Sequence, residues 1–456
     1  MTQNETSRKA VDRPQPESDV PRRALRVNGV AKFQAPRDGS LVIKHQEALG
    51  LICAAEETYS HHTGIVKEEL PAIVSHWLQS PKDVPILLDE SFRDRWIDLL
   101  RSRCLMASRN AASGLPEETS HPRPVHIDFS DLPFPPEAKP KFTFIDLFAG
   151  IGGFRIALQG LGGKCVFSSE WDRHAKETYN NNYGEVPFGD ITKLSDLHLL
   201  SSFDVLAGGF PCQPFSRAGV SARESLGKEH GFQCESQGQL FFDVVKIARH
   251  HLPKVIFLEN VGNLIRHDGG NTFKTIKNEI EALGYQFNHQ VYNSNPLVPQ
   301  SRVRCLIVAF RNDIIPKNWS MPKLSGKPLP LSSILEKMLP DNPYTLSEKM
   351  WAGHIRRSAA NVARGTGFTA YTKDLDKPST TLVARYYKDG KECLIPQPHH
   401  PKKLPRMLSE RECARLQGFP EKFITHKSKI YSYKQFGNSV PVPLIKFVAE
   451  SFVTSL

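Results

Sequence analysis

The feature that most constrains the fold is a regular alternation of short apolar runs and amphipathic segments that begins near residue 142. Strands are expected at 142–147, 164–169, 203–207 and 254–258, and helices at 154–161, 171–181 and 238–250. Strands that alternate with helices in this order indicate a mostly parallel sheet with helices on both faces. We therefore expect an α/β fold built on a doubly wound, Rossmann-like sheet.

The segments before this region differ from it in composition, and 456 residues are enough for more than one domain. Residues 1–40 are polar and rich in Pro, Arg, Asp and Glu, which predicts a disordered tail. Apolar residues recur at helical spacing through 41–110, which predicts a small helical accessory region. Residues 111–140 contain seven prolines and are expected to form a linker.

Charge and cysteine usage narrow the class of protein. The net charge is +11, and residues 311–408 alone hold 17 Lys and Arg against 8 Asp and Glu. This clustering is expected of a surface that binds a polyanion. Eight scattered cysteines without a Cys-x-x-Cys pair argue against a metal site or disulfide framework and indicate a reducing cytoplasm. We find no signal peptide and no apolar run that could span a bilayer.

A glycine-rich turn follows the first strand of the alternating region. Gly150, Gly152 and Gly153 would let the backbone approach a ligand at the start of a helix. Glu170 ends the next strand, where an acidic residue binds ribose hydroxyls, and Asp190 could accept a hydrogen bond from an adenine amino group. A dinucleotide fingerprint would have a third glycine where this chain has Arg155, so we expect a different adenosine ligand.

The third strand runs into Gly208-Gly-Phe-Pro-Cys-Gln-Pro-Phe-Ser216. A lone cysteine is usually a small buried hydrophobic residue. Here, glycines and prolines stiffen the loop just past a strand end, which is where ligands bind in open α/β sheets. We therefore interpret Cys212 as a nucleophile.

Five motifs occur in order and together identify a family. They are Asp146-Leu-Phe-Ala-Gly-Ile-Gly-Gly-Phe154, the Pro-Cys-Gln loop, Glu259-Asn-Val261, Gln300-Ser-Arg302-Val-Arg304 and Gln435-Phe-Gly-Asn-Ser-Val440. Over residues 141–456 the chain resembles the DNA (cytosine-5)-methyltransferases, and in places the Dcm-like bacterial subgroup. The resemblance implies a catalytic domain over 141–311, a smaller irregular target-recognition domain over 312–405, and a return to the catalytic domain over 406–456.

The resemblance implies transfer of a methyl group from S-adenosylmethionine to C5 of a cytosine in DNA. The Cys212 thiolate would add to C6 and make C5 nucleophilic. Glu259 would protonate or hydrogen-bond N3, and Arg304, with Arg302 beside it, would hydrogen-bond the base carbonyl. Asn260 would orient the loop that carries Cys212.

By the same resemblance, the methyl donor's site gathers residues from both ends of the domain. Besides the three glycines, Glu170 and Asp190, the expected residues are Phe148, Trp171, Ile191, Pro211, Leu240, Asn438, Ser439 and Val440.

The DNA-reading residues are expected in two places. The glycine-rich loop after Cys212 would close over a flipped base, with Ser221 and Arg223 on its DNA side. Arg364 and Arg385 lie in stretches similar to the recognition lobe of Dcm-like enzymes, and an arginine can read guanine in the major groove. That subgroup methylates the inner cytosine of CCWGG, where W is A or T, which gives the expected target.

Two alternative functions belong to other classes. A tRNA cytosine-5 methyltransferase would share the fold, but its usual Cys-Phe-Thr signature is absent here. A DNA-binding regulator would use the N-terminal helices and would not need the complete set of reactive residues. We expect a bacterial cytoplasmic enzyme near the nucleoid that acts as a monomer on double-stranded DNA, with no membrane contact. A restriction endonuclease with the same target is a possible partner.

Overall fold

The computed structural model describes residues 40–59, 67–81, 90–111, 123–193, 202–211, 239–339, 342–365 and 371–456. The expected disordered tail therefore lies outside the described residues, apart from Ser40. So do Cys212, Ser221, Arg223 and the loop that was expected to close over the base. Among the described helices, none combines the length and the apolar composition needed to cross a bilayer.

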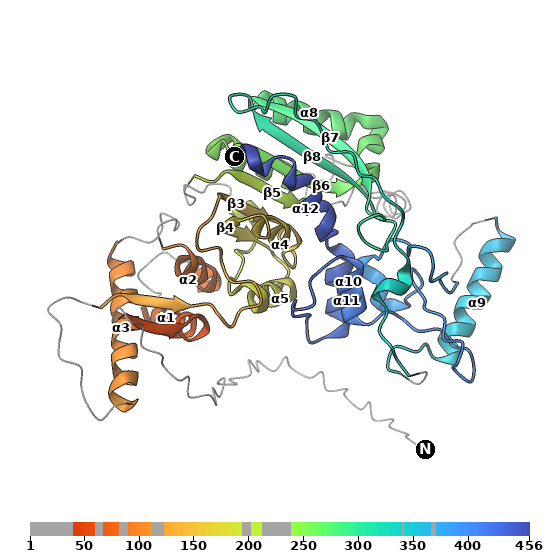
Figure 1. Cartoon of the computed structure of the whole chain (residues 1–456), viewed down its shortest axis with the longest axis horizontal. Coiled ribbons are helices and arrows are strands. Elements are labelled where there is room, and N and C mark those ends of the chain that lie inside the picture. The colour runs from red at the N-terminus through yellow and green to blue at the C-terminus, as the bar shows by residue number, and fades with distance from the viewer. Residues whose placement is uncertain are drawn as a thin grey trace, which may run out of the picture.

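A six-stranded sheet forms the centre of the described chain, in the order β4-β3-β5-β6-β8-β7 (Figure 1). Its strands are β3 Phe142–Leu147, β4 Gly163–Ser169, β5 Val205–Gly209, β6 Val255–Val261, β7 Tyr285–Asn293 and β8 Val303–Arg311. Strands β4, β3, β5 and β6 are parallel, whereas β8 pairs antiparallel with both β6 and β7. The chain moves outward from β3 to β4 and then crosses back to β5. The carboxyl ends of β3 and β5 therefore border the crevice where open α/β sheets bind ligands.

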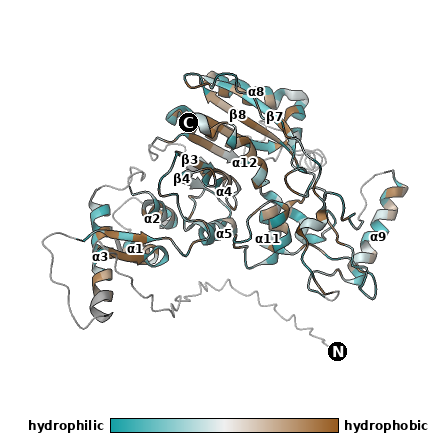
Figure 2. Ribbon diagram, in the orientation of Figure 1, coloured by the Kyte–Doolittle hydropathy of each residue, from teal (hydrophilic) through white to brown (hydrophobic). Residues whose placement is uncertain are grey.

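Helices cover both faces of this sheet, which confirms the expected doubly wound α/β class. One face packs against α4 Gly153–Gln159, α5 Arg173–Tyr183 and α12 Val442–Glu450. The other packs against α7 Gln239–His251 and α8 Asn271–Ala282. Strands β3 and β8 are mostly hydrophobic along their length (Figure 2), as expected when both faces of a sheet are buried.

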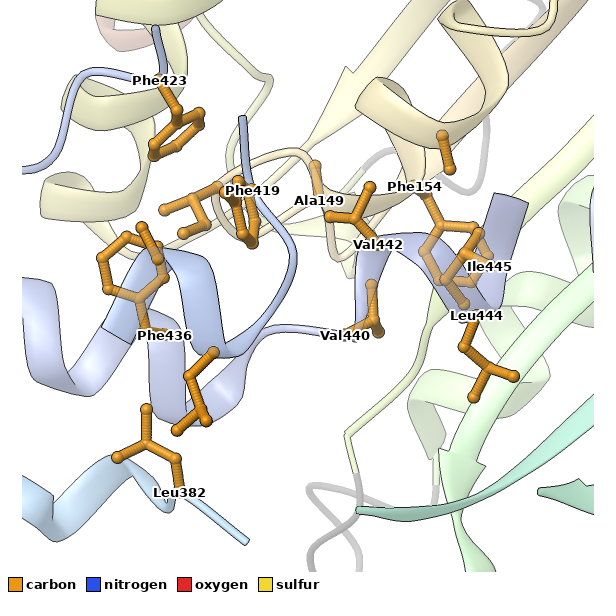
Figure 3. Close-up of a cluster of buried hydrophobic side chains, with 14 of the residues drawn as sticks. Ala149, Phe154, Leu382, Phe419, Phe423, Phe436, Val440, Val442, Leu444 and Ile445 are labelled. Atoms are coloured by element: carbon orange, nitrogen blue, oxygen red, sulfur yellow. The ribbon is translucent and has the colours of Figure 1, made fainter. Parts of the chain in front are cut away.

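The C-terminal segment returns to the first helix of the sheet. Val440, Val442 and Ile445 pack around Phe154 of α4 (Figure 3). A Cβ atom added to Gly153 would lie 2.6 Å from Cγ2 of Val440, so only glycine allows this close approach. The last seventeen residues thus complete the core that β3 begins.

Between β8 and this return, the chain has little regular structure. The described elements there are η6 Leu331–Ile334, α9 Glu348–Ala363 and η7 Ala384–Lys388. The chain then enters α10 Glu410–Leu416, α11 Lys429–Asn438, α12 and the final turn η8 Val453–Ser455. Ser409 and Glu412 form a capping box that fixes the start of α10. Cys413 in α10 is fully buried, as expected for a packed rather than reactive thiol, and burial raises its pKa.

The described part of the N-terminal region contains three helices, as the apolar spacing predicts, and one feature that this spacing does not predict. The helices are α1 His45–Tyr59, α2 Leu70–Gln79 and α3 Glu90–Ala111, with the short turn η2 Lys67–Glu69 before α2. In addition, β1 Leu41–Lys44 pairs in parallel with β2 Val125–Asp128. Strand β2 lies inside the range expected to be a linker, so part of that range is ordered against the N-terminal region. This region and one face of the central sheet share a single hydrophobic cluster.

Candidate active site

An ion pair joins the ends of two central strands at the open edge of the sheet. The Arg304 Nε atom on β8 lies 2.6 Å from Oε1 of Glu259 on β6, and both side chains are about nine-tenths buried. Gly209, the last residue of β5, pairs with Glu259, and a Cβ atom added to it would lie 3.2 Å from Oε2 of Glu259. The chain therefore passes directly beside this carboxylate three residues before Cys212.

Asn260 holds the chain that leads to Cys212. Its Nδ2 atom donates to the carbonyl of Phe210 at 3.3 Å, and its Oδ1 atom accepts from the Val261 N–H at 2.8 Å. Because Asn260 is buried and bonded on both sides, its orientation is fixed. Pro211, the next residue, is half-buried at the edge of the described chain.

Arg302 differs from the expectation that it contacts the base. Its guanidinium donates to three main-chain carbonyls, at 2.8 Å to Leu382, 3.0 Å to Gly437 and 2.6 Å to Ser439. The residue is 2% exposed. A guanidinium that already ties β8 to the recognition segment and to the C-terminal motif is a structural clamp. Contact between Arg302 and the base stays a prediction, and among the described contacts Arg304 is the arginine that pairs with Glu259.

The glycine turn after β3 also differs in part from its expected role. Gly152 has φ 81°, and a Cβ atom there would lie 2.4 Å from the ring of Tyr183, whose hydroxyl donates to the Gly152 carbonyl at 3.0 Å. Gly152 and Gly153 are thus required by side chains of the protein itself. Among the described residues, a Cβ atom on Gly150, with φ 56°, would meet one atom, the Phe148 carbonyl oxygen 4.0 Å away, so Gly150 has the most room of the three glycines.

Glu170 lies beside this turn, just past the end of β4. It is 9% exposed, and it accepts from the N–H groups of Gly150 and Asp172, each at 2.8 Å. Burial raises the pKa of Glu170, and these two hydrogen bonds oppose the rise. The neighbouring Trp171 is 84% exposed, so its indole is available to a ligand.

The remaining expected donor-site residues lie around the same edge with different exposures. Asp190 is exposed, and its Oδ1 atom accepts from the N–H and hydroxyl of Thr192 at 3.0 and 2.9 Å. The others are the half-buried Phe148, Leu240 and Ser439, the exposed Asn438, and the buried Ile191 and Val440.

The two arginines expected to read DNA are both exposed. Arg364 caps the C-terminal end of α9, and Arg385 lies in η7 beside the buried Tyr386. The α9 helix contacts the residue that follows η7: Nε2 of His354 lies 3.0 Å from the Asp389 carbonyl oxygen. In Figure 1, α9 projects from the far side of this lobe, away from the N-terminal helices.

Sequence reasoning noted Arg155 only as a missing glycine, and the structure gives it a different importance. Arg155 is fully buried, and its Nη1 atom lies 2.8 Å from Oε1 of Glu185. Its Nη2 atom donates to Gln79 on α2 at 2.9 Å. An arginine among the apolar residues of a short helix needs a buried acceptor or anion as its partner. The position of Arg155 in the sequence could therefore have predicted a buried ion pair.

One group of described residues has a metal-binding arrangement, formed by His174, Glu177 and His426. The Ser428 N–H donates to Nδ1 of His426 at 2.9 Å, so in the neutral ring Nε2 carries the hydrogen. That nitrogen lies 3.3 Å from Oε2 of Glu177 but forms no hydrogen bond among the described residues. A metal would need the lone pair at Nε2, so we interpret the group as a carboxylate packed between two imidazoles.

A glycine turn and an acidic strand end at the switch point of a doubly wound sheet form the arrangement in which open α/β sheets bind adenosine-containing ligands, and S-adenosylmethionine is one of these. The model of the C-5 cytosine-specific DNA methylase family matches residues 142–454. The chain therefore belongs to the C-5 cytosine-specific DNA methylases, enzymes that use S-adenosylmethionine to methylate cytosine in DNA.

Relatives with curated functions agree with this assignment. The chain is 45% identical over 320 residues to the Type II methyltransferase M.DsaV of Dactylococcopsis salina, covering 69% of this chain and 87% of that protein. It is 42% identical over 336 residues to M.SsoII of Shigella sonnei, covering 72% and 85%. It is 38% identical over 375 residues to the DNA-cytosine methyltransferase of Escherichia coli K12, covering 70% and 79%.

Solved structures show the same fold at lower sequence identity. The S. pombe Dnmt2 methyltransferase matches with a TM-score of 0.51 and 20% identity over 68% of this chain and 98% of that chain. A putative DNA modification methyltransferase from an E. coli prophage matches with a TM-score of 0.50 and 20% identity over 69% and 99%. The described N-terminal residues 40–128 lie before the range that the family model matches.

Proposed function

We propose that this enzyme methylates C5 of a flipped cytosine by covalent catalysis from Cys212. The Cys212 thiolate adds its electron pair to C6, and the pyrimidine ring becomes an enamine that is nucleophilic at C5. Bound S-adenosylmethionine supplies an electrophilic methyl group to that carbon. A base then removes the C5 proton, and the electron pair expels the thiolate to restore the ring and the free enzyme.

The observation that carries this proposal is the Glu259–Arg304 pair beside the end of β5. Addition at C6 places negative charge on N3 and the carbonyl oxygen of the base, so donors must be in place before the reaction. Glu259 lies next to the chain that leads to Cys212, and Arg304 holds its carboxylate at 2.6 Å. Glu259, carrying a proton, then hydrogen-bonds N3 or transfers that proton to it, and the proton returns to Glu259 when the thiolate leaves. Arg304 stabilises the charge on the carbonyl oxygen. Asn260 keeps the Phe210-Pro211 segment in register with this pair.

The donor's site lies at the carboxyl ends of β3 and β4. Among the described residues, Gly150 has the most room beside it of the three glycines. The Glu170 carboxylate accepts from two backbone N–H groups, and its remaining lone pairs can accept from ribose hydroxyls. Exposed Trp171 flanks the ligand, and Asp190 with Ile191 meets the adenine. Phe148, Pro211, Leu240 and the Asn438-Ser439-Val440 segment close the remaining sides.

For the target, we propose CCWGG with methylation of the inner cytosine. The proposal rests on the resemblance of the recognition lobe to Dcm-like enzymes and on 38% identity to the E. coli DNA-cytosine methyltransferase. Arg364 and Arg385 are exposed on neighbouring elements of this lobe, as base-reading residues must be. Ser221 and Arg223 would contact DNA from the loop that follows Cys212.

The domain boundaries belong to the same proposal. Residues 141–311 and 406–456 form the catalytic domain, and 312–405 form the target-recognition domain inserted between them. The enzyme acts as a monomer on double-stranded DNA in the cytoplasm, at the nucleoid where its substrate is. A restriction endonuclease that cuts the same sequence is its expected partner, because relatives bear Type II methyltransferase names.

One experiment tests the chemistry. Purified enzyme is given labelled S-adenosylmethionine with duplex DNA or with tRNA, and Cys212→Ala serves as the variant. We expect transfer to DNA only, loss of transfer in Cys212→Ala, and donor binding that is unchanged in the variant. Normal turnover by Cys212→Ala would show that Cys212 is not the nucleophile. Transfer to tRNA instead of DNA would show that DNA is not the substrate.

Two further measurements separate mechanism from target. DNA with 5-fluorocytosine at the target cannot lose a proton from C5, so wild-type enzyme should become covalently trapped on it. Bisulfite sequencing of DNA from cells that express the enzyme reads the target directly. Methylation of sites with G or C at the central position would refute the A or T requirement and leave the chemistry intact.

A further inference from the structure

The segment made of η2 and α2, residues 67–79, forms hydrogen bonds with the main chain of the catalytic domain. Both carboxylate oxygens of Glu69 accept from the Gly189 N–H, at 3.0 and 3.1 Å. Ser75 Oγ accepts from the Val186 N–H at 2.9 Å, and His76 Nε2 accepts from the Ser168 N–H at 3.1 Å. Gln79 Nε2 donates to the Tyr183 carbonyl at 2.7 Å. Four side chains thus satisfy the polar backbone of residues 168–189.

That stretch of backbone contains two residues of the proposed donor site, Glu170 and Trp171, and leads directly into two more, Asp190 and Ile191. Phe188 forms a bridge with Ser169 at the end of β4, and its carbonyl accepts from the Glu170 N–H at 2.8 Å. The Gly189 carbonyl accepts from the Ser169 hydroxyl at 2.9 Å. Both polar backbone groups of Gly189 are therefore hydrogen-bonded, the N–H to Glu69 and the carbonyl to Ser169. This fixes the backbone immediately before Asp190.

A buried ion network makes this contact difficult to separate. Arg155 lies between Glu185, at 2.8 Å, and the Gln79 side-chain oxygen, at 2.9 Å. Glu185 also accepts from the Ser168 hydroxyl at 2.6 Å. Burial alone would raise the pKa of Glu185, but the Arg155 guanidinium and the Ser168 hydroxyl lower it. Removing α2 would leave buried charges and polar groups without their partners, which is strongly destabilising.

We propose that residues 67–79, which lie outside the family match, are part of the methyl-donor site, and that Glu69 is its positioning residue. Glu69 fixes Gly189 so that Asp190 and Ile191 lie in place for the adenine. The N-terminal region is then a required part of the catalytic unit rather than a separable accessory. This inference rests on the proposed role of Asp190 and Ile191 in donor binding.

The first test compares Glu69→Ala with Glu68→Ala, measured as S-adenosylmethionine affinity by titration calorimetry on the full chain. Glu68 is the exposed neighbour, so its variant removes the same charge without the contact to Gly189. We expect Glu69→Ala to weaken donor binding by about tenfold, since one charge-assisted contact is lost at one remove from the ligand. DNA affinity and turnover at saturating donor should stay within about twofold of wild type, and Glu69→Gln, which keeps an acceptor oxygen, should recover part of the affinity.

A reciprocal variant shows whether the contact itself is responsible. A Cβ atom on Gly189 would lie 2.5 Å from Oε1 of Glu69, so Gly189→Ala must displace that carboxylate. Gly189→Ala should therefore weaken donor binding as much as Glu69→Ala does, and the double variant should lose nothing further. Fully additive losses would overturn the inference, as would a Glu69→Ala variant with the same donor affinity as Glu68→Ala.

Asp190→Ala distinguishes failure of this inference from failure of the proposed donor site. If Asp190→Ala weakens donor binding and Glu69→Ala does not, the positioning role is wrong and the site stands. If neither weakens donor binding, both are wrong. Because the double-variant comparison uses differences between variants, a general loss of stability in Glu69→Ala alone would not imitate the expected result.

Discussion

Replacing Arg302 should unfold the enzyme more easily, whereas replacing Arg304 two residues later should stop the reaction. Arg302 donates to the carbonyls of Leu382, Gly437 and Ser439 in a site that is 2% exposed. Arg302→Ala would leave these carbonyls without a charged donor. Each such bond contributes about 1.5–3 kcal/mol, and because the three share one donor we expect a total loss of about 3–5 kcal/mol. That is a large part of the about 5–15 kcal/mol that stabilises a typical domain.

The measurement is urea denaturation followed by circular dichroism, with donor affinity and turnover measured on the same preparations. Arg302→Lys keeps the positive charge but cannot reach three carbonyls from one ammonium group, so it should recover little of the lost stability. Arg304→Ala should also lower the free energy of unfolding, by about 3 kcal/mol, because Glu259 loses its ion-pair partner at a nine-tenths-buried site. Loss of turnover with donor affinity kept at the wild-type level then distinguishes Arg304→Ala from Arg302→Ala.

The opposite pattern would refute this reasoning. If Arg302→Ala unfolds at the wild-type urea concentration and yet loses turnover, its guanidinium acts on the base and the clamp is incidental. A second check uses the donor. Since Arg302 holds the Ser439 carbonyl, Arg302→Ala should also weaken S-adenosylmethionine binding, and Arg304→Ala should not.

Two further predictions concern pH and the target sequence. Burial lowers the pKa of His45 from 6.5 to about 4, so the folded protein keeps it neutral while the unfolded chain protonates it. Its stabilising contribution is therefore complete above pH 6.5 and is lost as the pH falls toward 4. Wild type should lose about 2 kcal/mol more stability than His45→Phe between pH 7 and 4.5, and parallel pH curves for the two would contradict this. Arg385→Ala should cost about 1–3 kcal/mol of discrimination between matched and mismatched sites if Arg385 reads a base. Equal weakening on all DNA sequences would instead indicate a phosphate contact.

The parts of the fold that the sequence predicts are those set by local patterns. Strand β3 matches its predicted range, and α4, α5 and α7 lie within about two residues of theirs, because apolar period and glycine position act over a few residues. Strand β2 was missed since its partner β1 lies some eighty residues earlier and prolines flank it. Only pairing across that distance makes these four residues a strand.

The same limit applies to the site. The Glu259-Asn260 strand end could be identified from the local sequence, and in the structure it lies beside Gly209 and Phe210. The different fates of Arg302 and Arg304 could not, since the carbonyls that bind Arg302 are 80 to 137 residues away in sequence. Likewise, nothing near Glu69 indicates that it meets Gly189, 120 residues later.

The packing of α12 against α4 has a consequence for how this chain is made. Phe154 and its neighbours emerge from the ribosome early, but the side chains that cover them, Val440 to Ile445, are translated last. The apolar face of α4 must stay exposed, or be shielded by a chaperone, during synthesis of nearly three hundred residues. Contacts this distant in sequence also slow folding, because a long loop must close before they form. If translation stops within the recognition lobe, the released fragment would therefore expose the apolar face of α4 and be prone to aggregate. Such fragments should be degraded rapidly.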